Sequence, residues 1–329
     1  MPAKKKVAPK KTIKKVTKPK VTKKVVKEIK IKKENNLFKG CKIYDNYYFP
    51  KFIDNIVRRV NMNYNIYLQG ATGVGKSELV NKLAQYNKIK LVRINFNIGI
   101  TEQHLIGKFI IKDNKTEFIY GLVPQAMKNG WWILFDEIDF AQPEHLASLQ
   151  SVLEGNSLLL TQNENEEIFP HPNFRVFATG NTKGRGDDTQ SYVGTNFLNA
   201  AFLDRWSIFE MDYPAQENII IDSILDDQRL SKDLISYFKI LRKNEEQGEF
   251  VNINFSTRRL IQIAKLLKAG ENLIDSLKFE LFSRVEKVEQ KLLMQLLFDI
   301  FQREHYLKGW KLGDAHTPEL EPADNTFES

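Results

Sequence analysis

Residues 64–80, with the sequence YNIYLQGATGVGKSELV, decide the fold. The first six residues are mostly apolar or aromatic and predict a short buried strand. The next eight match the phosphate-loop pattern G-x-x-x-x-G-K-[ST], and a helix from Lys76 to about residue 86 is predicted to follow. Glycines allow backbone N–H groups to approach phosphate oxygens closely, and the helix adds its positive N-terminal end. The stretch therefore predicts a strand–loop–helix unit that binds a chain of phosphates.

Two side chains of this loop have distinct expected tasks. Lys76 is expected to lie against the β- and γ-phosphates, and Ser77 to ligate Mg²⁺. A glycine-rich turn without a ligand is the alternative, but the predicted strand before the loop and helix after it count against that interpretation. The residues predicted to bind the nucleotide are Gly70, Ala71, Thr72, Gly73, Val74, Gly75, Lys76 and Ser77, together with Asp136.

The rest of the chain divides into a mixed region and a helical region. Further strands are predicted at 91–96, 131–135, 175–179 and 207–211, hairpins at 109–120 and 157–169, and helices at 123–128 and 144–153. Strands that alternate with helices imply a parallel sheet covered on both faces, and hence an α/β fold. After Pro214 only helices are predicted, near 216–226, 231–243, 256–268, 271–284 and 287–306. We therefore expect an α/β core at 37–213 and a helical lid domain at 214–312, between a disordered Lys-rich tail at 1–36 and a flexible end at 313–329.

Two acids follow the most apolar predicted strand, WWILF at 131–135. Asp136 and Glu137 are thus placed at the carboxyl end of a central strand, where α/β sheets bind their ligands. We expect Asp136 to hold the Mg²⁺ shell and Glu137 to orient and polarise the attacking water. Asp139 is expected to be a helix cap or a solvated acid.

Three more polar residues are candidates for catalysis. Asn181 follows the strand 175–179 and could reach the γ-phosphate, although an Asn after Gly180 is also typical of a turn. Arg205 and Arg258 carry guanidinium groups that could stabilise the charge of a transferring phosphoryl group. Isolated arginines are usually surface residues, so their pattern alone does not decide between the two interpretations.

The order of these motifs resembles the AAA+ superfamily and, within it, the MoxR-like branch. The order is GATGVGKS at 70–77, ILFDEID at 133–139, FRVFATGNT at 174–182, LDRW at 203–206 and STRR at 256–259. The stretches HLIG at 104–107, FIYGLVP at 118–124 and HPNFRVFATGNT at 171–182 are similar to the ATPase subunits of aerobic cobaltochelatases. The resemblance covers about residues 40–260.

The resemblance implies a Mg-ATP-hydrolysing enzyme that assembles as a hexameric ring with ATP between subunits. Arg205 would then be an arginine finger acting on a neighbour's ATP, Arg258 a sensor arginine in the same chain, and Asn181 a polar sensor. The resemblance also implies strand order 5-1-4-3-2, hairpin insertions near 109–120 and 157–169, and a partner protein with a von Willebrand factor A domain. ATP cycles would remodel or activate a partner complex, with metal chelation as one such task.

The cobaltochelatase role itself finds no further support in the residues. No corrin pocket can be identified, and the histidines have no metal-ligand spacing: His104, His145, His171, His305 and His316. The single cysteine, Cys41, excludes an internal disulfide. There is no apolar run of transmembrane length and no secretory signal, so we expect a cytoplasmic protein without a membrane contact.

The charge of the chain is concentrated at its beginning. Residues 1–33 contain fifteen lysines and one acid, which gives this tail a net charge of +14. The whole chain has a net charge of +8, so the remaining 296 residues carry a net charge of −6. The tail could contact nucleic acid or another polyanion, or it could simply be a solubilising segment. It has neither aromatic residues nor arginine, which disfavours sequence-specific recognition. A nucleic-acid-associated ATPase, tethered by this basic tail, is the alternative function. A third hypothesis, a scaffold that binds nucleotide without hydrolysing it, is disfavoured by the presence of Glu137.

Overall fold

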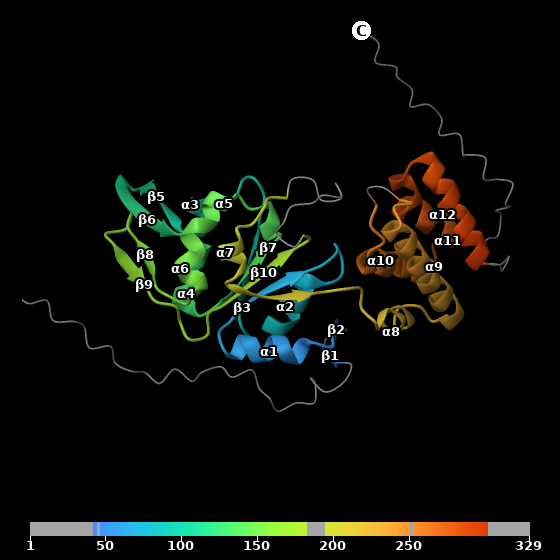
Figure 1. Ribbon diagram of the computed structural model, residues 1–329, viewed down its shortest axis with the longest axis horizontal. Coiled ribbons are helices and arrows are strands. Elements are labelled where there is room, and N and C mark those ends of the chain that lie inside the picture. The colour runs from blue at the N-terminus through green and yellow to red at the C-terminus, as the bar shows by residue number, and fades with distance from the viewer. Residues whose placement is uncertain (1–41, 45–46, 183–194, 251–252, 302–329) are drawn as a thin grey trace, which may run out of the picture.

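A five-stranded parallel sheet forms the centre of the N-terminal region in the computed structural model (Figure 1). The structure describes residues 42–44, 47–182, 195–250 and 253–301, so the tail predicted at 1–36 and the end predicted at 313–329 lie outside the described residues. The strands are β3 (Asn65–Gln69), β4 (Leu91–Asn95), β7 (Trp132–Asp136), β10 (Arg175–Gly180) and β11 (Trp206–Glu210). Their order is β11-β3-β10-β7-β4, with every neighbouring pair parallel. In order of appearance this is 5-1-4-3-2, which confirms the expected topology.

Helices cover both faces of this sheet, whose central strands β3, β7 and β10 are buried on both sides. On β7, Trp132 and Leu134 belong to the core beneath α1 (Ile53–Asn61) and α2 (Lys76–Tyr86). Ile133 and Phe135 belong to the opposite core, which includes α4 (Leu122–Asn129). Every residue of β7 is buried, so this strand forms the middle of the packed layers. Before β3 the structure also contains α1 and a hairpin of β1 (Lys42–Tyr44) and β2 (Tyr47–Phe49), none of which was predicted from the sequence.

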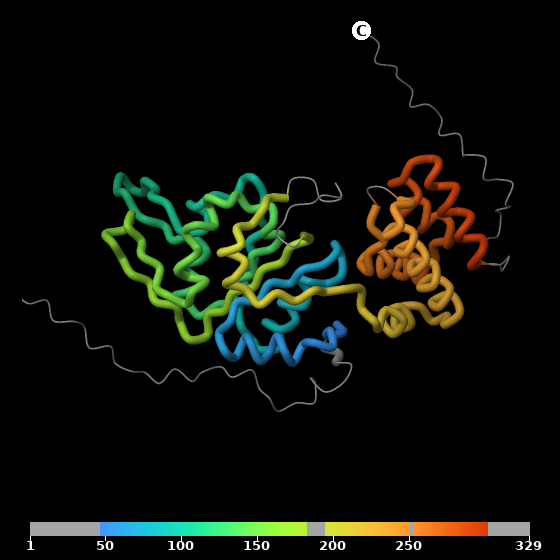
Figure 2. Tube along the Cα trace, in the orientation of Figure 1, coloured from blue at the N-terminus to red at the C-terminus, as the bar shows by residue number. Residues whose placement is uncertain are grey.

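Two β-hairpins project from the side of the sheet away from the C-terminal helices (Figure 1 and Figure 2). One pairs β5 (Gly107–Lys112) with β6 (Lys115–Tyr120), and the other pairs β8 (Leu158–Leu160) with β9 (Glu166–Ile168). A hydrogen bond of 2.6 Å from the Tyr120 hydroxyl to Glu166 connects them. Both predicted hairpins are therefore present.

The predicted helix at 144–153 is divided in the structure. It consists of α5 (Pro143–Leu146), the 3-10 turn η3 (Ala147–Leu149) and α6 (Gln150–Leu153). Short turns of helix that the sequence analysis did not assign are α3 (Glu102–Leu105), η2 (Ile138–Phe140) and α7 (Ala200–Leu203).

The C-terminal region is helical and has its own hydrophobic core. It contains α8 (Glu217–Asp222), α9 (Gln228–Glu246), α10 (Thr257–Lys268), α11 (Leu273–Glu280), η4 (Phe282–Arg284) and α12 (Lys287–Ile300). The predicted helix at 271–284 was too long, because Leu281 leaves helical geometry with φ −124° and ψ −60°. The separate cores favour a domain division at residue 214, which stays a prediction. Within the ranges that the structure describes, no helix combines the length and apolar character needed to span a bilayer.

A buried ion pair joins three parts of the helical region. Arg242 on α9 donates two hydrogen bonds, of 2.7 and 2.8 Å, to the carboxylate of Glu217 on α8. Its Nε donates to the Phe255 carbonyl oxygen at 2.8 Å, and Thr257 Oγ1 donates to Glu217 Oε1 at 2.5 Å. The pair therefore fixes the start of α10 relative to α8 and α9.

Candidate nucleotide-binding site

The loop between β3 and α2 requires glycine at two positions where it turns. Gly75 is the N-cap of α2 and has a left-handed φ of 98°, which a residue with a side chain rarely adopts. Gly73 has φ 79°, and a Cβ atom there would lie 2.5 Å from Cβ of Ser256 in the helical region. These glycines allow the loop to turn tightly and the helical region to approach it.

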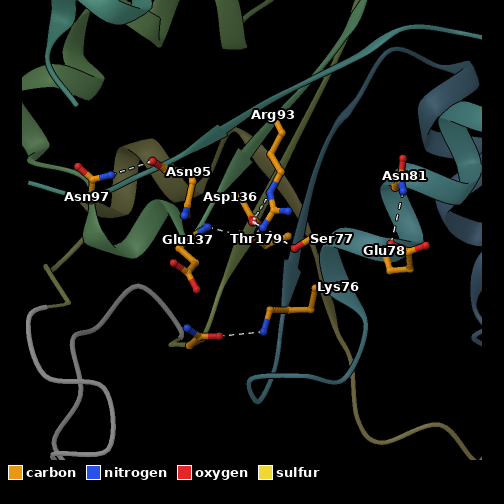
Figure 3. Close-up of polar contacts among 11 residues, drawn as sticks. Lys76, Ser77, Glu78, Asn81, Arg93, Asn95, Asn97, Asp136, Glu137 and Thr179 are labelled. Carbon is orange, nitrogen blue, oxygen red and sulfur yellow. Dashed lines mark hydrogen bonds and ion pairs between the residues drawn. The ribbon is translucent and has the colours of Figure 1, made fainter. Parts of the chain in front are cut away.

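Lys76 is buried beside the loop that it follows. Its Nζ donates hydrogen bonds to the carbonyl oxygens of Gly70 at 2.7 Å and Ala71 at 2.9 Å, and to Oδ1 of Asn181 at 2.9 Å. Burial lowers the pKa of the Lys76 ammonium to about 8, although nearby carboxylates oppose this shift. Figure 3 shows this side chain directed toward the same end of the sheet as Glu137.

Asp136 ends β7 and is 2% exposed. Its Oδ1 accepts hydrogen bonds from Ser77 Oγ at 2.6 Å and from Thr179 Oγ1. Its Oδ2 accepts from Arg93 Nε at 2.7 Å and from Nη2 of the same guanidinium (Figure 3). These partners offset the cost of burying a carboxylate.

The donor set at Asp136 fits Mg²⁺ bound together with phosphate. The Ser77 hydroxyl and the Asp136 carboxylate are adjacent hard oxygen ligands of the kind that Mg²⁺ prefers. In the described part of the chain, no group of three or more His, Cys, Asp or Glu side chains could hold a metal ion. An ion at Ser77 and Asp136 would therefore take its other ligands from water and phosphate, as Mg²⁺ usually does.

Glu137 has a backbone conformation that is rare for a residue with a side chain. Its φ and ψ are 55° and 46°, and its N–H donates to Thr179 Oγ1 at 3.0 Å. Burial raises the pKa of its half-buried carboxyl, and the negative charges of Asp136 and Asp139 add to this effect. Such strain is often found at functional sites.

The amide of Asn181 lies at the phosphate-loop lysine, whose Nζ donates to it, and the polar-sensor role that the family resemblance implies stays a prediction. Its Oδ1 also accepts a 3.4 Å hydrogen bond from Thr72 Oγ1. The expectation for Asp139 was wrong: it is 0% exposed, and its Oδ2 accepts hydrogen bonds from the backbone N–H groups of Asn181 and Thr182. Directly after Glu137, η2 turns the chain back toward β10. The Asp139 side chain therefore lies beneath the end of β10.

A cavity of about 370 Å³ extends from the loop to the helical region. Of the predicted site residues, it is lined by Thr72, Gly73, Val74, Gly75, Lys76, Ser77, Asp136, Glu137, Asn181 and Arg258. Gly70 and Ala71 contact Lys76 through their carbonyl groups. Arg205 is not among the lining residues: it borders a second cavity and pairs with Glu154 at 2.5 Å.

Sequence reasoning missed several residues of this cavity. Tyr47, Tyr48, Arg93 and Thr179 all line it, and the Tyr47 hydroxyl donates to the Gly75 carbonyl oxygen at 3.1 Å. Thr179, the residue two before Asn181 and near the end of a predicted strand, could have been identified from that position. The tyrosines and Arg93 gave no such signal, because their contacts arise only when separate segments fold together.

Comparisons with known proteins agree with this geometry. Residues 65–205 match the family described as AAA domain (dynein-related subfamily). The aerobic cobaltochelatase subunit CobS from Sinorhizobium sp is 37% identical over 150 residues, which are 44% of this chain and 45% of that protein. An uncharacterized protein from Staphylococcus epidermidis (strain ATCC 12228) is 31% identical over 214 residues, which are 62% of this chain and 78% of the relative.

The chain spans less than half the length of the cobaltochelatase subunit that it matches. A solved structure from Cytophaga hutchinsonii aligns over 76% of this chain and 80% of its own, with 19% identity and a TM-score of 0.40. The phosphate loop, the paired acids, the strand order and the matched family together establish that the chain belongs to the AAA+ ATPases, in their MoxR-like branch.

Proposed function

We propose that this protein binds Mg-ATP in the cavity at residues 70–77 and hydrolyses it with Glu137. The observation that carries the proposal is the meeting of Lys76, Ser77, Asp136 and Asn181 at one end of the sheet, although they come from three separate segments. Phosphoryl transfer depends on positioning and charge stabilisation, which these groups can supply.

Each side chain has a task that follows from its position. Lys76 and the loop N–H groups would bind the β- and γ-phosphates, and Ser77 and Asp136 would hold Mg²⁺. The metal, when bound, neutralises charge on the phosphate oxygens. Glu137 would accept a proton from the attacking water and orient it. Asn181, from the α/β core, and Arg258, from the helical region, line the same cavity and would contact the γ-phosphate.

The apolar part of the cavity suits the nucleotide base. Tyr47 and Tyr48 come from the N-terminal hairpin, while Pro214, Ile220 and Ile261 come from the helical region. Aromatic and aliphatic walls with few polar groups are typical of base-binding pockets. A nucleotide in this cavity would therefore contact both regions, and each ATP cycle would shift the helical lid relative to the core.

A Glu137→Gln variant tests the proposal. The amide keeps the shape of the side chain but cannot accept the proton, so ATP should bind with wild-type affinity and turnover should fall at least about 100-fold. Glu144→Gln, at an exposed position, is the control and should hydrolyse ATP normally. Wild-type turnover in the Glu137→Gln variant would refute the role of Glu137, and absence of turnover in the wild-type protein would refute the function.

We also propose a homo-oligomeric ring, a hexamer, in which Arg205 acts on the ATP of a neighbouring subunit. Support comes from the position of Arg205 outside the cavity of its own chain. Arg205→Ala should bind ATP but not hydrolyse it. Mixed with Glu137→Gln protein it should regain activity, because some interfaces then combine an intact Glu137 with an intact Arg205. No recovery in mixtures that form rings would contradict action between subunits.

The proposed output of the cycle is remodelling or activation of a partner complex. The relative from Sinorhizobium is a subunit of an aerobic cobaltochelatase, so metal chelation with a partner that has a von Willebrand factor A domain is the first candidate. Pull-down with ATP-loaded Glu137→Gln protein, compared with Lys76→Ala, should enrich such a partner. Equal recovery by both variants would contradict ATP-dependent binding.

The Lys-rich tail supports a second proposal, contact with nucleic acid. Its charge of +14 within 33 residues favours binding to a polyanion through release of counterions. Deleting residues 1–33 should abolish binding to a DNA or RNA duplex, and binding of the full chain should weaken steeply with salt. Affinity that is unaffected by the deletion or by salt would contradict this proposal.

A further inference from the structure

Asp139 is a fully buried carboxylate that the proposed chemistry does not use. It lies on η2, two residues after Glu137, and its side chain is 0% exposed. A buried carboxylate is costly unless polar partners surround it, so its presence here calls for a physical reason.

The partners of Asp139 belong to the segment that carries Asn181. Oδ2 accepts hydrogen bonds from the N–H groups of Asn181 at 2.8 Å and Thr182 at 3.0 Å, and from Thr182 Oγ1 at 3.2 Å. Hydrogen bonds from backbone N–H groups to an ionised carboxylate are stronger than those between neutral groups. One oxygen of Asp139 thus fixes the main chain directly after β10.

This main chain determines where the amide of Asn181 points. Its Oδ1 lies 2.9 Å from Lys76 Nζ, and the hydroxyl of Tyr67 on β3 contacts the carbonyl oxygen of Thr182 at 3.2 Å. Asn181 is therefore held by its N–H on one side and by its side chain on the other. Loss of the Asp139 carboxylate would remove the first of these restraints.

A second segment is fixed by the same turn. The N–H of Asn196 donates to the carbonyl oxygen of Asp139 at 2.7 Å, and Asn196 Nδ2 donates to the Ala141 carbonyl oxygen at 3.1 Å. Asp139 thus contacts residues before and after positions 183–194. Its other carboxylate oxygen, Oδ1, has no hydrogen-bond partner among the described atoms.

We propose that Asp139 is a positioning residue, which holds the backbone of Asn181 so that its amide reaches the phosphate end of the cavity. The inference rests on the proposed function, because it takes the task of Asn181 from there. Asp139 would thus be a third functional acid beside Asp136 and Glu137. It would act through its hydrogen bonds to the residues after β10, and not by contact with the substrate.

The test combines Asp139→Ala, Asn181→Ala and the double variant with two kinds of measurement. Turnover of Asp139→Ala should fall about tenfold or more, with an ATP affinity within about threefold of wild type. Hydrogen exchange of the Asn181 and Thr182 amides, followed on a peptide that covers 176–182, should become faster. The double variant should be no slower than Asn181→Ala, since Asp139 acts through Asn181. Asp113→Asn, on an exposed hairpin turn, is the matched control.

Asp139→Asn keeps the size of the side chain and serves if Asp139→Ala does not fold. It retains an oxygen acceptor but not the charge, so its turnover should lie between those of wild type and Asp139→Ala. If Asp139→Ala does not fold, turnover of Asp139→Asn should be about threefold or more below that of wild type. The inference would be overturned if the folded Asp139 variant had turnover within twofold of wild type and unchanged hydrogen exchange. It would also be overturned if the loss of turnover in the double variant equalled the product of the two single losses. If the wild-type protein shows no turnover, the proposed function fails, whereas the exchange measurement still reports whether Asp139 holds Asn181.

Discussion

Ser77 and Asp136 are 59 residues apart in sequence, yet Ser77 Oγ donates a 2.6 Å hydrogen bond to Asp136 Oδ1. The contact joins the start of α2 to the end of β7 and places a hydroxyl and a carboxylate where one metal ion could bind both. It arises because the parallel strands β3 and β7 end at the same edge of the sheet, one on each side of β10.

Removing the hydroxyl of this pair should weaken metal binding selectively. In Ser77→Ala, the Mg²⁺ concentration for half-maximal turnover should rise about tenfold, because one protein ligand is lost. ATP binding in EDTA should stay near wild type. Ser236→Ala, on the exposed side of α9, is the control. An unchanged Mg²⁺ requirement would contradict the assignment of Ser77.

The affinity for ATP should depend on pH through Lys76. Burial lowers the pKa of this ammonium to about 8 in the free protein, while Asp139, Asp136 and Glu137 oppose the shift and Arg258 adds to it. Bound phosphates favour the charged form and raise that pKa, so binding takes up a proton above pH 8. Affinity is thus full below pH 8 and falls as the pH rises through it. Titration of a fluorescent ATP analogue in EDTA between pH 7 and 9.5 measures this, and affinity that is constant or rises would contradict it.

The left-handed backbone at Glu137 predicts that glycine is better tolerated than alanine at this position. With φ 55°, this position suits glycine, so Glu137→Gly should be more stable than Glu137→Ala by about 1 kcal/mol. Neither variant should hydrolyse ATP. Urea unfolding of the two proteins measures the difference, and an alanine variant that equals or exceeds the glycine variant in stability would show that the backbone is not strained.

The buried Arg242–Glu217 pair should matter greatly for the stability of the helical region. Arg242→Ala leaves Glu217 buried without its cation and should cost about 3–5 kcal/mol in the free energy of unfolding. Replacing both residues, as in Glu217→Leu with Arg242→Met, should cost less than the sum of the single changes. Additive losses in urea unfolding would show that the two residues are not energetically coupled.

The parts of the fold that depend on local pattern could be predicted from the sequence. The apolar run before Asp136 indicates a central strand, and the glycine pattern before Lys76 indicates the loop and the helix. The strand order came from the resemblance to a family, and it is confirmed. Elements without a strong pattern were missed, as with the short strands β1 and β2, or given wrong limits, as at Leu281.

The residues of the candidate site also divide into those that a sequence motif identifies and those that it does not. Residues singled out by a chemical motif, such as Lys76 and Asp136, line one cavity in the structure, and their roles stay predictions. Asp139 was taken for a helix cap or a solvated acid, because nothing in its neighbours indicates that η2 turns it beneath β10. Arg93 was not singled out, since its contact with Asp136 depends on the pairing of β4 with β7. Side chains whose role is set by a partner on another strand need the structure.

Equilibrium binding of ATP to Lys76→Ala provides the sharpest test of the assignment of the site. Lys76 supplies the cation at the loop, so its loss should weaken ATP binding at least about 100-fold. The control Lys112→Ala, at an exposed position on the β5–β6 hairpin, should bind as the wild type does. Wild-type affinity in a folded Lys76→Ala protein would show that the nucleotide does not bind at residues 70–77.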